Sequence, residues 1–313
     1  MVEAMALGAL AIDAALGWPA GLHARVGHPV GGFARLIQWC ERRWNRPLRD
    51  EGRRRWGGVA TLLLLLAVAA GAGWAVEQAV RLLMGRWAWI GLAIAAWPAL
   101  AQRSLHDHVR PVAVTLLDGD LAGARRAVGH IVGRDTGVLD EQGVARAAIE
   151  SLAESFCDGV VAPLFWLLVA GLPGIWAYKA VNTADSLIGH KEEPFAAYGW
   201  AAARFDDLLN LVPARLAGLL LCLAGISGWR VLWRDHGRHA SPNAGWPEAA
   251  MAGALRVRLA GPVHYDGVRH DKAWIGGEGR DAGAADVAAA LLIYGRACAL
   301  LWLMTALVEG ARG

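Results

Sequence analysis

The sequence predicts an all-α, polytopic integral membrane protein with about five to six transmembrane or re-entrant helices plus cytoplasmic helical segments. Apolar residues make up 56% of the 313 positions and charged residues only 19%, a balance that a water-soluble fold of this length would struggle to bury. Two runs of 20 residues, 57–76 and 159–178, contain no charge, and about 20 apolar residues span the hydrocarbon as a helix. No strand-period run, repeat or sustained heptad pattern occurs, which favours the all-α class.

Six segments are predicted to enter the membrane. In addition to the two uncharged runs, they are 4–22, 87–102, 208–229 and 287–308. No Lys or Arg precedes the apolar stretch of 4–22, so this segment fits an uncleaved first helix better than a secretory signal peptide. Tryptophans near the expected ends of these segments suit the headgroup region: Trp56, Trp87, Trp89, Trp176, Trp229 and Trp233.

Between these segments we expect four polar stretches within one membrane-embedded domain of residues 1–313: 23–56, 103–158, 179–207 and 230–283. The first contains nine arginines and three acidic residues, which predicts a cytoplasmic loop by the positive-inside rule. Arginine clusters also bind nucleic acid, but beside an apolar run anionic membrane lipid is the nearer partner. We therefore expect lipid and no nucleic acid.

The segment 159–178 raises a question of topology. If it and 208–229 both cross the membrane fully, the polar stretch 179–207 lies outside. Pro163, Gly171, Pro173 and Gly174 interrupt the first of them, which favours a broken or re-entrant helix that returns 179–207 to the cytoplasmic side.

The long polar stretches contain helix signals of their own. Residues 121–132 have a helical pattern, and Asp140 is placed to cap a following helix. Pro247 suits the start of a helix that Gly261 ends, and the glycine-rich 276–283 predicts a loop.

Several kinds of site are excluded or disfavoured by motif. The cysteines Cys40, Cys157, Cys222 and Cys298 are far apart and include no Cys-x-x-Cys, so neither a disulfide framework nor a zinc site is expected. No Gly-x-x-x-x-Gly-Lys-Ser/Thr occurs, so a nucleotide is not held by a P-loop. His28, His106 and His108 are isolated, and we interpret them as hydrogen-bonding groups rather than metal ligands.

One cation and three carboxylates recur every four residues before the uncharged run 159–178: Arg146, Glu150, Glu154 and Asp158. This spacing places them on one helix face. A metal or a phosphate–metal complex would explain the crowding, and an Arg146–Glu150 pair on a solvated face is the alternative. Asp158 favours function, because a charge next to an apolar run is costly.

Two further polar groups lie in 179–215. Lys179, Asn182 and Ser186 share a helix face with Asp185 beside them; lysine suits phosphate and aspartate suits Mg²⁺, although a polar helix end at the interface is the alternative. Asp206 and Asp207 stand together at the mouth of a span and repel unless a cation lies nearby. Either Arg215 or a Mg²⁺ ion would supply that cation.

The segment Ile131-Val-Gly-Arg-Asp-Thr136 combines a glycine, a cation and a hydroxyl, as anion-binding turns do. It adds Arg134 and Asp135 to the candidate residues.

Together these blocks resemble the adenosylcobinamide-phosphate synthase family, the CobD/CbiB family of cobalamin biosynthesis membrane proteins. They recur in order over most of the chain: His28-Pro-Val30, Ile131–Thr136, Ile149–Glu154 with Asp158-Gly159, Ala162–Phe165, Tyr178–Ser186, Arg204 to Asp206-Asp207, Pro213-Ala-Arg215 and Ser241-Pro-Asn-Ala-Gly245. Ser155, Ile188 and His190 depart from the usual Asn, Met and Tyr. None of these departures removes a charge, so they bear on substrate fit rather than reaction type.

The resemblance implies a multi-pass enzyme of the inner membrane in vitamin B12 biosynthesis. It would join (R)-1-amino-2-propanol O-2-phosphate to a carboxylate of adenosylcobyric acid, a corrinoid, in an amide ligation that consumes ATP with Mg²⁺. Other late enzymes of the cobalamin pathway are conceivable partners at the arginine-rich loop.

On this hypothesis the candidate residues fall into three sets. The catalytic set is Glu150, Glu154, Asp158, Asp185 and Asp207. The substrate or phosphate set is Arg134, Asp135, Lys179, Asn182, Ser186, Arg215 and Asn243. The metal set is Asp185, Asp206 and Asp207.

Two rival functions remain open. A transporter of a corrinoid or related anion would also use broken helices and charges in spans, such as Asp13, Arg215 and Arg296, but the charges here gather at segment ends. A membrane-embedded sensor or assembly factor would share the scaffold without the catalysis.

Overall fold

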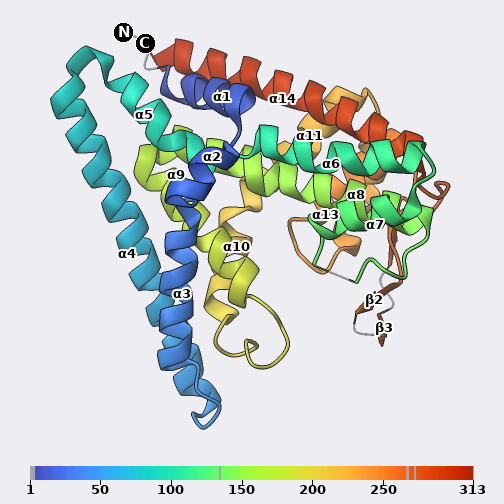
Figure 1. The fold of residues 1–313 in the computed structure, drawn as a ribbon, viewed down its shortest axis with the longest axis horizontal. Coiled ribbons are helices and arrows are strands. Elements are labelled where there is room, and N and C mark those ends of the chain that lie inside the picture. Colours follow the sequence, from blue (N-terminus) through green and yellow to red (C-terminus); the bar gives the residue numbers. More distant parts are fainter. Residues whose placement is uncertain (1–3, 134, 266–267, 271–272, 313) are drawn as a thin grey trace. The chain divides into compact units, whose positions relative to one another are not determined.

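The protein is described by a computed structural model that places residues 4–133, 135–265, 268–270 and 273–312. Helices make up almost all of the regular structure (Figure 1), so the all-α prediction is confirmed. The contacts divide the chain into two compact units. The first unit comprises Met1–Ala101, Ala162–Asn210 and Thr305–Gly313, and the second comprises Gln102–Val161 and Leu211–Met304.

The first unit is organised around the long helix α4. Helices α3 and α9 both pack on α4, and α10 packs on α4 and α9; Figure 1 shows α3 running beside α4. Buried residues such as Ile37, Leu65 and Tyr198 form the core between them. The elements are α1 (Met5–Leu16), α2 (Ala20–Val26), α3 (Val30–Trp44), α4 (Glu51–Met84), the 3₁₀ turns η1 (Gly85–Trp87) and η2 (Trp97–Ala99), α5 (Ala88–Ala96), α9 (Ala162–Ile188), α10 (Trp200–Leu209) and the last residues of α14 (Ala284–Arg312).

The second unit contains the shorter helices and two small β-ladders. Strand β1 pairs antiparallel with β4, and β2 pairs with β3. The elements are α6 (Gln102–Leu117), α7 (Leu121–Gly129), α8 (Glu141–Phe156), the π-helical turn η3 (Cys157–Val161), α11 (Leu211–Gly225), α12 (Trp229–Asp235), η4 (His236–Arg238), α13 (Gly245–Leu255), β1 (Leu259–Ala260), β2 (Val263–Tyr265), β3 (Val268–His270), β4 (Trp274–Ile275) and most of α14.

Of the local signals in the second unit, one had the expected effect and another did so only in part. The Asp140 side chain accepts a hydrogen bond from the Gly143 amide at 2.7 Å and caps α8, as predicted. Helix α13 begins near Pro247 but ends at Arg256, which is in the left-handed region, before Gly261. The β-ladders were not expected, because strands of two or three residues are too short to show a period.

The apolar helices support a membrane protein. Three helical stretches, 51–117, 141–188 and 284–311, are long and apolar enough to cross a bilayer, and two bent pairs of helices raise the number to five. Leu63, Trp74 and Leu82 on α4 are 61%, 60% and 86% exposed. Large apolar side chains exposed in this way suit contact with lipid.

Helix α9 is broken at Ala170 and Gly171, where Gly171 has φ of +63°. The break therefore falls inside 159–178, where it was expected; the side of the membrane on which 179–207 lies stays a prediction. Glu77 of α4 accepts a hydrogen bond from the Leu172 amide at 3.1 Å, and Arg81 pairs with the same carboxylate at 3.1 Å. A backbone donor freed by the break thus has a partner, which apolar surroundings require.

The loop between α9 and α10 is fixed to the beginning of α4. Arg54 pairs with Glu193 at 2.6 Å and also donates to the Pro194 carbonyl. The Tyr198 and Thr61 hydroxyls lie 2.5 Å apart. A Cβ at Gly58 would overlap the Tyr198 carbonyl, so the close approach of this loop requires glycine there.

The two ends of the chain meet through one carboxylate. Glu309, which is 5% exposed, accepts hydrogen bonds from the amides of Ala6 at 2.8 Å and Leu7 at 3.3 Å. These amides lie in the first turn of α1, where no carbonyl of the helix can reach them. Glu309 therefore acts as the N-terminal cap of α1.

Replacing Glu309 by Ala should lower the free energy of unfolding by about 1–3 kcal/mol, because one buried and one partly buried amide lose their acceptor. Thermal unfolding of the detergent-solubilised protein measures this loss. Glu192→Ala, at an exposed position of the same unit, is the control and should unfold as the wild type does. An equal effect of both substitutions would refute the capping role.

Candidate functional site

The candidate residues of the first unit include two acids that lie near each other. Asp185 near the end of α9 and Asp207 on α10 interact electrostatically. The Asp185 carboxylate rests against Gly189, because a Cβ at that position would overlap it. Both carboxylates are only partly buried. Two acids in such an arrangement favour a cation between or beside them.

Basic side chains lie near this pair. Arg204 donates to Asp207 at 3.1 Å, and its side chain is 58% exposed. Lys191 is an electrostatic neighbour of Asp207, and His190 is one of Asp185. Both belong to the loop that Arg54 and Tyr198 fix to α4. This corner therefore presents acidic and basic side chains together.

Asp206 has different surroundings from its neighbour Asp207. Its side chain is 8% exposed and accepts a hydrogen bond from the Asn210 amide group at 2.9 Å. Asn210 in turn accepts from the buried Tyr178 hydroxyl at 3.0 Å. Asp206 thus belongs to a buried chain of hydrogen bonds that joins α10 to α9, and this distinguishes two acids that the sequence treats alike.

The remaining candidates of the first unit lie on α9 itself. The Lys179 carbonyl accepts from Thr183 at 2.7 Å, and the exposed Ser186 donates to the Asn182 carbonyl at 2.9 Å. The helix continues to Ile188, so Lys179, Asn182, Asp185 and Ser186 have the helical spacing that the sequence suggested.

His28 adds a group that sequence reasoning had set aside. Burial lowers the pKa of His28, and the charges of Lys179 and His23 lower it further. Its Nδ1 accepts the Val30 amide proton at 3.2 Å, so in the neutral ring the proton lies on Nε2. In its neutral form His28 is therefore a hydrogen-bond donor through Nε2, with Lys179 as an electrostatic neighbour.

In the second unit the four-residue series on α8 divides. Arg146 and Glu150 approach to 3.9 Å, which supports the pairing alternative. The Glu150 carboxylate also accepts the Ala260 amide of β1 at 2.8 Å, and the Arg146 guanidinium lies 5.1 Å from the Trp274 ring. These contacts fix Glu150 in the fold, whereas Glu154 is exposed.

Asp158 lies in the π-helical turn η3, half-buried. Such turns are rare and occur often at functional sites. The turn supports a functional role of Asp158 over that of a plain solvated face.

Side-chain hydroxyls hold the turn between α7 and α8 in place by hydrogen bonds to backbone carbonyls. Ser151 donates to the Ile131 carbonyl at 2.8 Å, and Thr136 donates to the Arg125 carbonyl at 3.0 Å. Asp135 accepts the Gly137 amide at 2.8 Å and is exposed. Arg134 lies outside the described residues.

Arg215 and Asn243, far apart in sequence, meet in the second unit. The Arg215 guanidinium donates to the Asn243 side chain at 3.2 Å and lies 4.7 Å from the Trp246 ring. Ser241 accepts the amides of Asn243 and Ala244 at 3.2 and 3.3 Å. The Ser241-Pro-Asn block is therefore a turn that presents Asn243 to Arg215.

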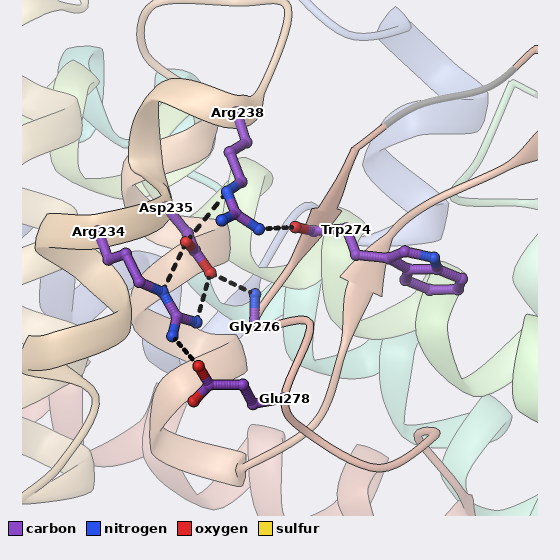
Figure 2. Close-up of polar contacts among 6 residues, drawn as sticks. All are labelled: Arg234, Asp235, Arg238, Trp274, Gly276 and Glu278. Atoms are coloured by element: carbon purple, nitrogen blue, oxygen red, sulfur yellow. Dashed lines mark hydrogen bonds and ion pairs between the residues drawn. The ribbon is translucent and has the colours of Figure 1, made fainter.

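Sequence reasoning missed a buried acid in this unit, Asp235 (Figure 2). Its side chain is 0% exposed and binds Arg234 through both oxygens at 2.8 and 2.9 Å. It also accepts the Gly276 amide at 2.8 Å and pairs with Arg238 at 3.1 Å. Arg238 donates to the Trp274 carbonyl, so this cluster holds β4 in place. The adjacent charges Arg234-Asp235 were the only sequence signal.

The pKa of Asp235 follows from these contacts. Burial alone would raise it, but the hydrogen bonds from Arg234 and Gly276 outweigh burial and hold the pKa of this carboxyl below its usual range. A depressed pKa means that the ionised carboxylate is favoured more in the folded protein than in the unfolded chain, so its ionisation stabilises the fold.

Asp235→Asn should lower the free energy of unfolding at pH 7 by roughly 2–3 kcal/mol, since the arginines are partly exposed and a fully buried pair is worth more. The stabilisation is complete above the unfolded pKa of about 3.9 and is lost as the pH falls through the lower folded value. Denaturant unfolding from pH 7 to pH 3 should show the two proteins converging at acid pH. The exposed Asp118→Asn serves as control, and a gap as wide at pH 3 as at pH 7 would contradict the assignment.

No group of three or more His, Cys, Asp or Glu side chains suited to a metal ion is present in the part of the chain that the structure describes. Mg²⁺ often uses only one or two carboxylates with substrate phosphates and water. Asp185 and Asp207 supply oxygen ligands of that kind, whereas Asp206 is engaged with Asn210. The donor set thus fits a Mg²⁺ ion that would take its remaining ligands from water or a phosphate.

Comparison with known proteins gives the family. Residues 6–294 match the family described as CobD/Cbib protein. "Cobalamin biosynthesis protein CobD" of Rhodobacter capsulatus is 52% identical over 312 residues, which cover 97% of this chain and 96% of the relative. Proteins of the same name from Sinorhizobium sp (48% identity, 94% of each chain) and Geobacter metallireducens (43% identity, 96% and 95%) are also similar. No solved structure matches. This chain belongs to the CobD/CbiB family of cobalamin biosynthesis proteins.

Proposed function

We propose that this protein is an adenosylcobinamide-phosphate synthase of the inner (cytoplasmic) membrane. It joins the amine of (R)-1-amino-2-propanol O-2-phosphate to a side-chain carboxylate of adenosylcobyric acid, with ATP consumed. The observation that carries the proposal is the family match over residues 6–294. The juxtaposed acids and cations around Asp185 and Asp207 support it, because the amine substrate bears both charges.

The chemistry requires activation of both reactants. A carboxylate is a poor electrophile, and an ammonium ion has no free electron pair. In the proposed reaction a carboxylate oxygen attacks the γ-phosphorus of ATP, and ADP leaves. The deprotonated amine then attacks the acyl carbon of the acyl phosphate, the amide bond forms, and inorganic phosphate departs. Mg²⁺, when bound, offsets negative charge on the phosphoryl group in transfer.

The acids of the first unit are assigned to the amine and to Mg²⁺. Asp207 and Asp185 would bind the ammonium group, accept its proton or hold Mg²⁺. Asp206 would position Asp207 through the buried Asn210 and Tyr178. Lys179 would hold a phosphate, with Asn182 and Ser186 donating hydrogen bonds.

The second unit contributes the other assignments. Arg215 and Asn243 would bind an oxyanion of a substrate, and Arg134 and Asp135 would belong to a phosphate-binding turn. Glu154 and Asp158 would act as acids or bases, whereas Glu150 would act through the position of β1, whose amide it binds.

Asp207→Asn should reduce kcat by about 10²–10⁴-fold, the usual effect of losing a group that transfers a proton, while membrane insertion and thermal stability are retained. Turnover and unfolding are measured on the same purified sample. Asp118→Asn, at an exposed position of the second unit, should turn over as the wild type does. Near-normal turnover of the Asp207 variant would sink its assignment.

The reaction itself is tested by incubating purified protein with ATP, Mg²⁺, adenosylcobyric acid and aminopropanol phosphate. Mass analysis should show a product equal to the two reactants less one water, with ADP formed in equal amount. ADP without this product, or no conversion by a folded sample, would overturn the proposal.

A transporter is the second candidate, because α9 is broken inside an apolar stretch and Glu77 lies at the break. Proteoliposomes loaded with corrinoid distinguish the two functions. Counterflow of labelled corrinoid without ATP would favour a transporter, whereas the ligase should give none.

A further inference from the structure

Arg215 is a cation without an acidic partner in the second unit. Its Nη1 donates to the Leu211 carbonyl at 2.7 Å and to Asn243 at 3.2 Å. Among the described residues no carboxylate pairs with it, and its Nε and Nη2 find no acceptor. A partly buried guanidinium usually has an anion beside it, so a negatively charged group remains to be supplied.

The Arg215 guanidinium lies against the ring of Trp246. The indole N–H of Trp246 is a second hydrogen-bond donor without an acceptor in the described part of the chain. The residue is 6% exposed, and its indole nitrogen is buried without a hydrogen-bond partner in the described part of the chain. Partly buried indoles of this protein have acceptors: those of Trp97, Trp166, Trp176 and Trp302 each donate to an oxygen. In the described part of the chain, the buried indole nitrogen of Trp18 in the first unit also lacks a partner, but no unpaired cation is shown against that ring. A buried donor without an acceptor is unfavourable and calls for an explanation, such as a ligand.

The ring of Trp246 is held in a fixed position. His236 stacks on it with the ring centroids 4.1 Å apart and the planes at 22°, and Trp233 packs edge-on at 5.4 Å. Asn243, which is 6% exposed, holds Arg215 by accepting its hydrogen bond at 3.2 Å. Both donors are thus oriented before any ligand arrives, which reduces the entropy cost of binding.

We propose that the Arg215 guanidinium and the Trp246 indole N–H together form an oxyanion-binding site. The guanidinium lies 4.7 Å from the centre of the ring that carries the indole nitrogen, so the two donors are neighbours, and a phosphate or carboxylate group is the acceptor that suits both. The inference rests on the proposed function only for the identity of the ligand. ATP, aminopropanol phosphate and adenosylcobyric acid all carry such oxygens.

The substitution Trp246→Phe distinguishes the role of the indole N–H from the role of the aromatic ring. Phenylalanine keeps an aromatic face for Arg215 and His236 but has no N–H. Trp233→Phe is the matched control, since its side chain is 59% exposed and packs on the same ring. Binding of ATP, aminopropanol phosphate and adenosylcobyric acid is measured separately by calorimetry on the full-length protein in detergent, and thermal unfolding is recorded with and without each compound.

We expect Trp246→Phe to weaken binding of one of the three compounds about tenfold or more, the usual effect of losing a hydrogen bond to a charged group. The compound affected identifies the ligand. Without ligand the variant should be as stable as the wild type or more so, because a buried unpaired donor has been removed. Trp233→Phe should bind all three as the wild type does.

A purely structural Trp246 would give the opposite pattern: the variant would lose stability without ligand and bind every compound normally, which would overturn the inference. If the wild type forms product while Trp246→Phe binds all three compounds unchanged, the inference fails and the proposed function stands. If the wild type neither binds the compounds nor forms product, both fail.

Discussion

The structure depends on one constraint: in apolar surroundings, the backbone groups at every helix end or break need a partner. Glu309 accepts the first amides of α1, and Glu77 accepts the amide after the break in α9. At the other ends, indoles donate to carbonyls: Trp97 to Gly17, Trp176 to Ala95 and Trp166 to Leu209. Acids at N-termini and tryptophans at C-termini thus allow short, bent helices where a continuous span would otherwise be needed.

The fold class and the cap at Asp140 could be read from the sequence because they depend on neighbouring residues. The cap at Glu309 could not, since it joins residues 303 positions apart. Tryptophans near span ends were interpreted as headgroup anchors, whereas Trp176 also closes a helix. Asp206 and Asp207 have the same side chain, and they differ in that Asp206 accepts a hydrogen bond from Asn210, which itself accepts one from Tyr178. Asp235 was missed because its importance lies in its burial, which no local pattern encodes.

The charges of each unit are of two kinds. Some are neutralised inside the fold, such as Asp235 between two arginines, and they fix loops and strands. Others keep a partly exposed carboxylate or guanidinium without a complete set of partners, such as Asp185 near Asp207, and Arg215 over Trp246. The neutralised charges hold the others in position. The pair of Arg54 with Glu193, for example, anchors the loop that contains Lys191, an electrostatic neighbour of Asp207.

Helix α4 has 34 residues, about 51 Å at 1.5 Å per residue, against a hydrocarbon thickness of about 30 Å. Its uncharged run begins at Gly57, so the turn that carries Arg54 extends beyond the acyl chains. The loop before α10 is attached to this turn and to Thr61, within about 11 Å along the helix axis. The length of one helix therefore keeps the loop that neighbours Asp185 and Asp207 outside the acyl chains.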